Sequence, residues 1–289
     1  MGTLSILRME QDVKTSTESE LRLVLPSRAE NVALVRRALT GVVDVLGLGD
    51  ARLLDINAAV SEACNNVVVH AYEDAEGPMD VHLRIEPSEL EVIVSDDGVG
   101  IRPNVPEPGL EVQGLGLSLI HALTDRVEFL GGTGEGTEVR MGFAFDDGPE
   151  GLSNGDHRDG REAPPPPGEL SITVSSGPLA APVLGRVIAM LAARAEFSLE
   201  GISEAELVTD ALAAHAPRAI VGDRIQLGID RPDGQLVVRV GPLTEGGATR
   251  VIQASALENL PPVLERLTEH HAVESSQDGE LLCLVLGAR

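Results

Sequence analysis

Apolar and polar residues recur with two different periodicities along residues 20–145, and these periodicities predict an ordered series of strands and helices. Alternation of apolar and polar residues predicts strands, at 21–25, 79–86, 89–95, 125–130 and 136–143. Apolar residues three or four positions apart predict helices, at 28–46, 50–71 and 115–124. We therefore expect an α+β fold, in which a two-layer α/β sandwich places the helices on one face of a mostly antiparallel sheet.

The periodic pattern of apolar residues stops at residues 146–169. This stretch is acidic and Gly-rich at first and then contains a run of prolines from Pro164 to Pro167. Such a stretch cannot build a core, and it favours an extended spacer. The chain is therefore divided into four parts: a polar leader at 1–19, a domain at 20–145, a linker at 146–169 and a second domain at 170–289.

The two domains resemble each other in the order of their segments. The strand that opens at Leu21 corresponds to one that opens at Leu170, and Val60-Ser-Glu-Ala corresponds to Val208-Thr-Asp-Ala. Chance similarity between segments rich in Leu, Val and Ala is the alternative explanation. We interpret the likeness as a duplication of the sandwich.

The composition limits the kinds of partner that the chain could bind and the cell compartment in which we expect it. A net charge of −24 disfavours binding to nucleic acid or to an anionic membrane and suits a protein partner with a basic face. Cys64 and Cys283 are the only cysteines, and no apolar run suits a signal peptide or a membrane-spanning helix. We expect a cytoplasmic protein that binds neither nucleic acid nor membrane.

Lysine usage excludes two classes of phosphate-transfer site. Lys14 is the only lysine, and it lies in the polar leader. A P-loop needs a Gly-Lys-Ser/Thr string, and a conventional protein kinase needs a strand lysine that contacts the phosphates. Neither site can be built from this sequence.

Four short segments of the first domain carry side chains suited to nucleotide chemistry, and they occur in a fixed order. Glu62 to His70 lies on the second predicted helix, and Asp96 to Gly100 follows a predicted strand. Gly114 to Gly116 opens the third helix, and Gly136-Thr137 opens the last strand. Each segment alone has an ordinary structural explanation, such as a cap or a turn. The four together predict one site.

The chemistry of these residue types is consistent with a nucleotide and a metal ion. Glu62, Asn66 and His70 are four residues apart, so a helix places them on one face. Amide and carboxylate oxygens there suit Mg²⁺, a hard cation that takes few protein ligands. Asp96 offers an acceptor for the exocyclic amine of adenine. The Gly114-Leu-Gly116 string leaves N–H groups free at a helix start, where phosphates bind.

This order of segments resembles the nucleotide-binding boxes shared by gyrase B, MutL and the sensor histidine kinases. The string from Ser61-Glu-Ala to His70-Ala-Tyr72 is most similar to the anti-sigma-factor serine/threonine kinase branch of that superfamily. The resemblance covers residues 20–145 and implies a kinase that uses ATP and Mg²⁺.

The resemblance also implies a role for each residue. Asn66 would hold Mg²⁺, Asp96 would contact adenine, and Glu62 would be the general base for the hydroxyl of a target serine. The other nucleotide-binding residues would be the glycines of the lid and of the helix after it, together with the residue that opens the last strand: Gly98, Gly100, Gly114, Gly116 and Thr137.

By this resemblance the chain would be an ATP-binding anti-sigma regulatory factor. It would phosphorylate an anti-sigma-factor antagonist on serine and would sequester a sigma factor. The alternative is a non-catalytic, nucleotide-dependent switch or scaffold in a stress-response partner-switching pathway. A histidine-kinase fragment is a third interpretation, which the sequence disfavours because no long helix pair with a phosphoacceptor histidine precedes the domain.

The second domain has lost the residues on which the predicted site depends. Asn66 aligns with Ala214 and Asp96 aligns with Pro242. We therefore expect a degenerate copy without an ATP site. We also expect this copy to replace the partner subunit of a dimer, so that one chain forms a monomeric pseudo-dimer.

Overall fold

The computed structural model describes residues 19–72, 75–100, 115–132, 134, 136–146, 163–256 and 260–287. The first half contains β1 (Ser19–Pro26), α1 (Ala29–Leu46), α2 (Asp50–Asn66), η1 (Val67–Ala71), β2 (Pro78–Ile85), β3 (Glu89–Asp96), α3 (Leu115–Leu123), β4 (Arg126–Gly131) and β5 (Thr137–Ala144). The second half contains β6 (Leu170–Ser175), α4 (Ala180–Arg194), α5 (Leu199–His215), η2 (Ala216–Arg218), β7 (Arg224–Asp230), β8 (Gln235–Leu243), α6 (Gly247–Ala254), α7 (Val263–Arg266), β9 (His270–Ser275) and β10 (Glu280–Gly287).

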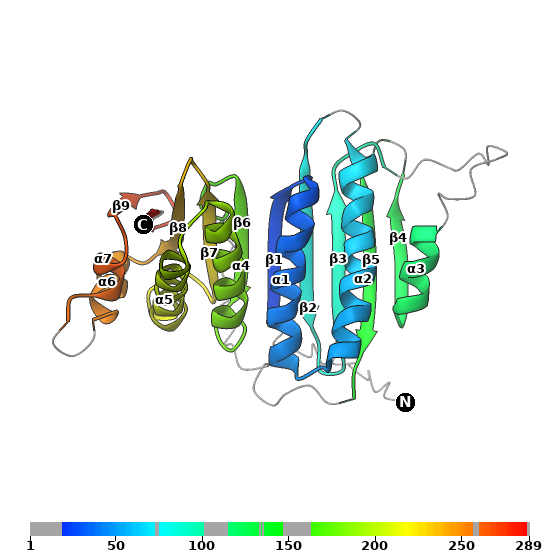
Figure 1. The fold of residues 1–289 in the computed structure, drawn as a ribbon, viewed down its shortest axis with the longest axis horizontal. Coiled ribbons are helices and arrows are strands. Elements are labelled where there is room, and N and C mark those ends of the chain that lie inside the picture. The colour runs from blue at the N-terminus through cyan, green and yellow to red at the C-terminus, as the bar shows by residue number, and fades with distance from the viewer. Residues whose placement is uncertain are drawn as a thin grey trace, which may run out of the picture.

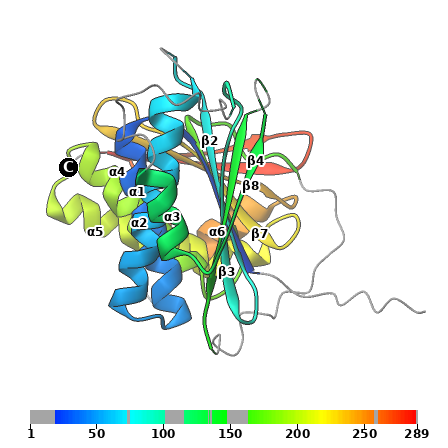
Figure 2. The same ribbon diagram turned by 90° about the vertical axis from the view of Figure 1, so that its right-hand side faces the viewer.

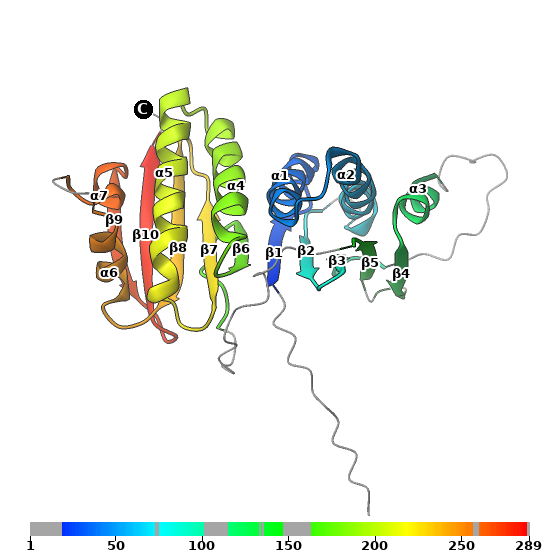
Figure 3. The same cartoon turned by 90° about the horizontal axis from the view of Figure 1, so that it is seen from below.

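The strands form one ten-stranded sheet in the order β4-β5-β3-β2-β1-β6-β7-β8-β10-β9, and every pairing is antiparallel. Helices α1 to α5 cover the same face of this sheet (Figures 1 and 3). Seen from the side, the helical layer and the sheet form two distinct layers (Figure 2). The predicted α+β sandwich is confirmed.

Strand β1 shows how alternation in the sequence selects the buried face. Leu21, Leu23 and Leu25 are at most 2% exposed and face the helices. Arg22 lies between two of them and points to the opposite face, where it pairs with Asp80 of β2. A strand places successive side chains on opposite faces, so the period-two pattern sets which face is covered by helices.

The two halves meet at the centre of the sheet, where β1 pairs with β6. Leu21 and Leu23 lie opposite Val174 and Ile172 in this pairing. Above it, α1 packs closely on α4, because Gly41 has no side chain: a Cβ there would lie 2.9 Å from the carbonyl oxygen of Pro182. The buried residues of both halves form one continuous hydrophobic core.

Ion pairs also join the halves. On the outer face of the sheet, Glu20 of β1 accepts from Arg224 of β7 at 2.6 Å and contacts His82 Nε2 at 3.0 Å. Arg28 pairs with Glu169 at 2.5 Å, next to the start of β6. The halves are therefore held together by backbone pairing, apolar packing and charge.

The two halves have the same order of strands and the same pairing order, β1-β2-β3-β5-β4 and β6-β7-β8-β10-β9. Two helices follow the first strand in each half; the third strand is followed by α3 in the first half and by α6 and α7 in the second. This arrangement is the one that a duplication would produce. Descent of the second half from a copy of the first stays a prediction.

The end of the predicted linker is not a free spacer. Pro166 is buried, and the backbone at 166–167 crosses β7 where Gly228 leaves room: a Cβ on Gly228 would overlap the carbonyl oxygens of both prolines. Arg239 donates to the carbonyl of Pro167 at 3.2 Å, and the Glu169 amide donates to Asp230 at 2.8 Å. This proline segment is therefore a strap on the outer face of the sheet.

Candidate functional site

The predicted site residues gather where β3 ends, β5 begins and α2 leads into η1. Asp96 and Thr137 are direct neighbours in the antiparallel pairing of β3 with β5. The amide of Val99 donates to the carbonyl of Ala71 at 2.9 Å, which ties the loop after β3 to the end of η1. Segments far apart in the sequence thus meet at one end of the first half.

Asp96 is the buried acceptor of this site, with 8% of its surface exposed. Its Oδ1 accepts from the Gly98 amide at 2.8 Å, and the backbone and hydroxyl of Thr137 also hydrogen-bond to its carboxylate. Burial raises the pKa of Asp96 above its usual range, although the three hydrogen bonds oppose that rise. An ionised carboxylate accepts about four hydrogen bonds. Beyond these three hydrogen bonds from described residues, the carboxylate therefore keeps acceptor capacity for one further donor.

Tyr72 holds the loop that follows Asp96, and the prediction of site residues missed it. Its hydroxyl donates to the carbonyl of Pro78 at 2.6 Å and accepts from the amide of Asp97 at 2.9 Å. Its ring lies over Gly77, where any Cβ would overlap the ring carbons. Tyr72 is the only tyrosine in the chain, and its position in the quoted string was the one available signal.

Glycines permit the close approach of three loops around Asp96. A Cβ on Gly98 would overlap the carbonyl oxygen of Ala71. Gly100 has a φ of 74°, and a Cβ there would overlap the carbonyl of Gly132. Gly136 also has a φ of 74°, a left-handed conformation that favours glycine. The structure therefore explains Gly98 and Gly100 through backbone contacts, and it adds Gly136 to the predicted set.

Glu62 lies beside the start of α3. A Cβ on Gly116 would overlap Oε1 of Glu62, so the first turn of α3 packs directly on this carboxylate. Arg52 of α2 pairs with Asp125, which follows α3. The two helices are therefore antiparallel neighbours, and the Glu62 side chain is half-buried between the core and solvent.

Asn66 ends the α-helical part of α2 and is half-buried. The predicted helix at 50–71 changes its winding there, because Val67–Ala71 forms a π-helical turn. A π turn adds a residue to each turn, and such turns are frequent at functional sites. His70 is exposed after this change, so it does not continue the face that carries Glu62 and Asn66.

Two predictions about the site, the lid with Gly114 and the metal site, can be compared with the described residues only in part. Gly114 lies outside them, as do residues 101–113 of the loop at 97–113 that is predicted to be a lid. Within the described residues, no group of three or more His, Cys, Asp or Glu side chains could hold a metal ion. A metal bound here would depend on Asn66 with ligands from water and nucleotide, which is how Mg²⁺ is commonly held.

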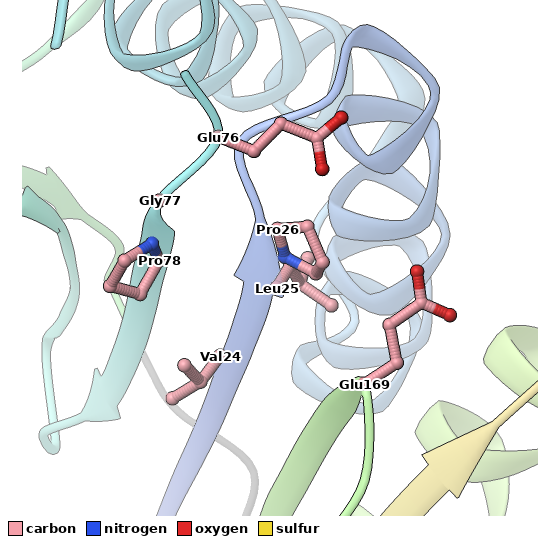
Figure 4. Close-up of a pocket in the computed structure, with 7 residues that line it drawn as sticks. All are labelled: Val24, Leu25, Pro26, Glu76, Gly77, Pro78 and Glu169. Atoms are coloured by element: carbon pink, nitrogen blue, oxygen red, sulfur yellow. The ribbon is translucent and has the colours of Figure 1, made fainter. Parts of the chain in front are cut away.

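A surface pocket of about 300 Å³ lies elsewhere, at the junction of the halves. Glu76 and Glu169 flank Pro26 on its rim (Figure 4). Arg28 pairs with both carboxylates, with N–O distances of 2.8 Å to Glu76 and 2.5 Å to Glu169. The pocket contains none of the predicted nucleotide-binding residues, and both of its carboxylates are already paired with Arg28.

Comparison with known proteins bears on residues 25–143, which match a family model described as the histidine kinase-like ATPase domain. The serine-protein kinase RsbW of Bacillus mycoides (strain KBAB4) is 32% identical over 123 residues, covering 38% of this chain and 77% of that protein. The proteins of the same name from Bacillus cereus (strain ATCC 10987 / NRS 248) and Bacillus thuringiensis (strain Al Hakam) are 32% and 31% identical over the same shares.

None of the helices in the described part of the chain is both long enough and apolar enough to cross a bilayer.

Proposed function

Because the chain belongs to the histidine kinase-like ATPase family, we propose that its first half binds ATP with Mg²⁺ and transfers phosphate to a serine of a partner protein. The observation that carries this proposal is the buried carboxylate of Asp96, which is held by Gly98 and Thr137 and retains capacity for one more donor. The exocyclic amine of adenine is a donor of the required kind.

The phosphate end of the site would be built from α2 and α3. Asn66 would supply an amide oxygen to Mg²⁺ from the last residue of α2. The backbone N–H groups at the start of α3, near Gly116, would face the phosphates, because the first N–H groups of a helix have no partner within it. Bound ATP with Mg²⁺ supplies the phosphoryl group and neutralises its charge during transfer.

Glu62 would act as the general base. Its carboxylate lies against the first turn of α3 and is half-buried, so it is accessible beside the proposed phosphate site. It would take the proton from the serine hydroxyl as that oxygen attacks the γ-phosphorus of ATP, and the bond from this phosphorus to the bridging oxygen would break to release ADP. A positioned base of this kind typically contributes about 10²–10⁴-fold to the rate.

The partner would be an anti-sigma-factor antagonist, and the chain would otherwise hold a sigma factor. The support for this step is the resemblance to the anti-sigma kinase branch and the serine-protein kinase relatives. The net charge of −24 favours a partner that presents a basic surface. The same partners would suit the alternative function, a nucleotide-dependent switch that transfers no phosphate.

The second half would take the place of a partner subunit. Pairing of β1 with β6 occupies the sheet edge of the first half, and α4 covers the side of α1 at Gly41. A chain of this form would be a monomeric pseudo-dimer with a single ATP site.

Calorimetry with ATP and Mg²⁺ tests the binding step on the intact chain, on Asn66→Ala and on Asp96→Asn. The proposal expects one ATP per chain and a loss of binding in both variants. No binding to the intact chain would overturn it.

Phosphate transfer to a candidate antagonist then separates the two functions. Kinase function expects Glu62→Gln to bind ATP normally and to lose transfer. If the intact chain binds ATP, yet neither it nor the variant transfers phosphate, the switch function holds.

A further inference from the structure

Helix α5 lies in the same place in the second half as α2 does in the first. Each is the second helix of its half, and each lies beside one helix of the central pair α1 and α4 (Figure 3). The Val208-Thr-Asp-Ala string of α5 aligns with the Val60-Ser-Glu-Ala string of α2. Exposure can therefore be compared position by position along the two helices.

The side of α2 that faces α3 is covered. Gly116 of α3 packs on the carboxylate of Glu62, and Arg52 pairs with Asp125, which follows α3. Residues three or four positions apart share one face of a helix. On this face Ala59 is fully buried, and the other members are half-buried. The full set is Arg52, Asp55, Ala59, Glu62 and Asn66.

The aligned positions of α5 are all exposed, and we call them the α5 stripe: Glu200, Ser203, Leu207, Asp210 and Ala214. Leu207 aligns with the fully buried Ala59, yet 52% of Leu207 is exposed. The helix that precedes β9, as α3 precedes β4, is α7, which has 4 residues where α3 has 9. A helix of about one turn is too short to cover α5 as α3 covers α2. The α5 stripe is therefore uncovered within the described part of the chain.

Two leucines give this face an apolar centre. Leu199 is 85% exposed, and Leu207 lies about two turns later on the same side of α5. The exposed Ser203 lies midway between them, so no large polar side chain separates the pair. Exposed leucines scattered singly are normal, whereas apolar residues gathered on one exposed face mark a surface that packs against a partner.

Carboxylates surround the two leucines. Glu200 and Asp210 belong to the α5 stripe, and Glu206 is also exposed. Residues 195–217 contain no lysine or arginine. Within the described residues, none of these three carboxylates forms an ion pair. Their negative charge is therefore available to a cationic partner.

We propose that the α5 stripe, together with Leu199, is a docking surface for a basic amphipathic helix of a protein partner. The apolar side of that helix would bury Leu199 and Leu207. Its lysines or arginines would pair with Glu200, Glu206 and Asp210. The partner helix would lie on α5 as α3 lies on α2, which is recognition of a helix by its apolar face. The surface belongs to the second half alone, so the proposal stands whether or not the first half binds ATP.

A second copy of this chain does not have the complementary charge. A twofold contact would bring the same face of α5 from each copy together. Glu200, Glu206 and Asp210 would then meet like charges with no cation between them. The occupant that the charges favour is therefore a cationic helix of another protein.

A synthetic peptide is the probe. It has about 18 residues, enough to form a helix, with leucines three and four positions apart and lysines elsewhere. The control peptide has the same residues in shuffled order, so it keeps its attraction to a chain of net charge −24 but has no apolar face. Fluorescence anisotropy should show saturable binding of one amphipathic peptide per intact chain and much weaker binding of the shuffled one. Bound peptide should slow amide hydrogen exchange in α5.

Matched variants separate docking on α5 from general charge attraction. Leu207→Gln should weaken binding of the amphipathic peptide about tenfold or more. Leu54→Gln should leave it unchanged, because Leu54 is 69% exposed on α2, outside the α5 stripe. Glu206→Gln should weaken binding roughly two- to fivefold. Asp233→Asn, which removes an exposed carboxylate between β7 and β8, should have no effect.

Three results would overturn the proposal. The first is equal affinity of the intact chain and Leu207→Gln for the amphipathic peptide, or no saturable binding at all. The second is equal binding of the shuffled peptide. The third is self-association of the intact chain in sedimentation that Leu207→Gln abolishes, because the occupant would then be a second copy.

Discussion

Gly116 of α3 lies so close to Glu62 of α2 that a methyl group on the glycine would overlap the carboxylate. The overlapping atom is the end of a flexible side chain, so Gly116→Ala should rotate Glu62 away without unfolding the helix. Alanine also favours a helix over glycine by up to about 1 kcal/mol. We expect a chain at least as stable as the original, with phosphate transfer slower by about tenfold or more.

A double-mutant cycle checks the cause of that slower transfer. In a Glu62→Gln background, Gly116→Ala should slow transfer no further, because the base is already absent. Additive losses would show that Gly116 acts on the phosphates and not through Glu62.

Tyr72→Phe should weaken the site by releasing the loop after Asp96. The variant loses the hydroxyl that joins Pro78 to the amide of Asp97. A net loss of about 1 kcal/mol in the free energy of unfolding is expected, with weaker ATP binding measured by calorimetry. Thr40→Ala is the control, since its hydroxyl bonds only to the carbonyl of Arg36 within α1. Equal ATP affinity in Tyr72→Phe and the intact chain would contradict the role assigned to Tyr72.

ATP affinity should fall in mild acid, because Asp96 becomes protonated there. Burial raises its folded-state pKa above the unfolded value of 3.8. The protonated carboxyl loses acceptor capacity for the adenine amine, so binding weakens as the pH falls through this raised pKa. Calorimetry across the acid range should show the weakening begin at a higher pH than an ordinary aspartate would give. Asp96→Asn should bind weakly at every pH.

The folded chain should lose stability at lower pH through Glu20. Burial alone would raise the pKa of Glu20, but His82 and Arg224 lower it below 4.5. The stabilising contribution is therefore complete above 4.5 and is lost as the pH falls through the lowered folded-state pKa. Acid unfolding of Glu20→Gln should be less steep in this range than that of the intact chain. Identical acid-unfolding curves would argue against this contribution.

Gly41→Val should disrupt the junction of the halves. Its side chain would enter the backbone of Pro182, which cannot move without displacing α4. Overpacking of this kind destabilises by about 1–3 kcal/mol, and the single unfolding transition should split or shift to lower temperature in calorimetric scans. Gly185→Ala on α4 is the matched control, because nothing lies within 4 Å of its Cβ position. It should be neutral or stabilising.

The sequence predicted most elements of the first half because each one has a local pattern. Strand β1 alternates leucines with polar residues, and its burial follows that alternation. The sequence also indicated that Asp96 and Thr137 belong to one site; the pairing of β3 with β5 places the two residues side by side, and their role in binding stays a prediction.

Features that depend on tertiary contacts were missed. The π turn at Val67–Ala71 has the composition of an ordinary helix, so its winding could not be read from the residue types. Helix α6 was not predicted, because its eight residues are too few for a clear period. Pro166 was expected in a spacer, and only Gly228 on a distant strand explains why it is buried.

The central pairing of β1 with β6 changes how the protein responds to its own abundance. A two-chain assembly comes apart on dilution, so the amount of assembled pair rises with the square of expression at low levels. Here the two sides of the junction belong to one polypeptide, and dilution cannot separate them. The junction forms within each molecule as it folds, so the number of paired junctions scales linearly with the number of copies.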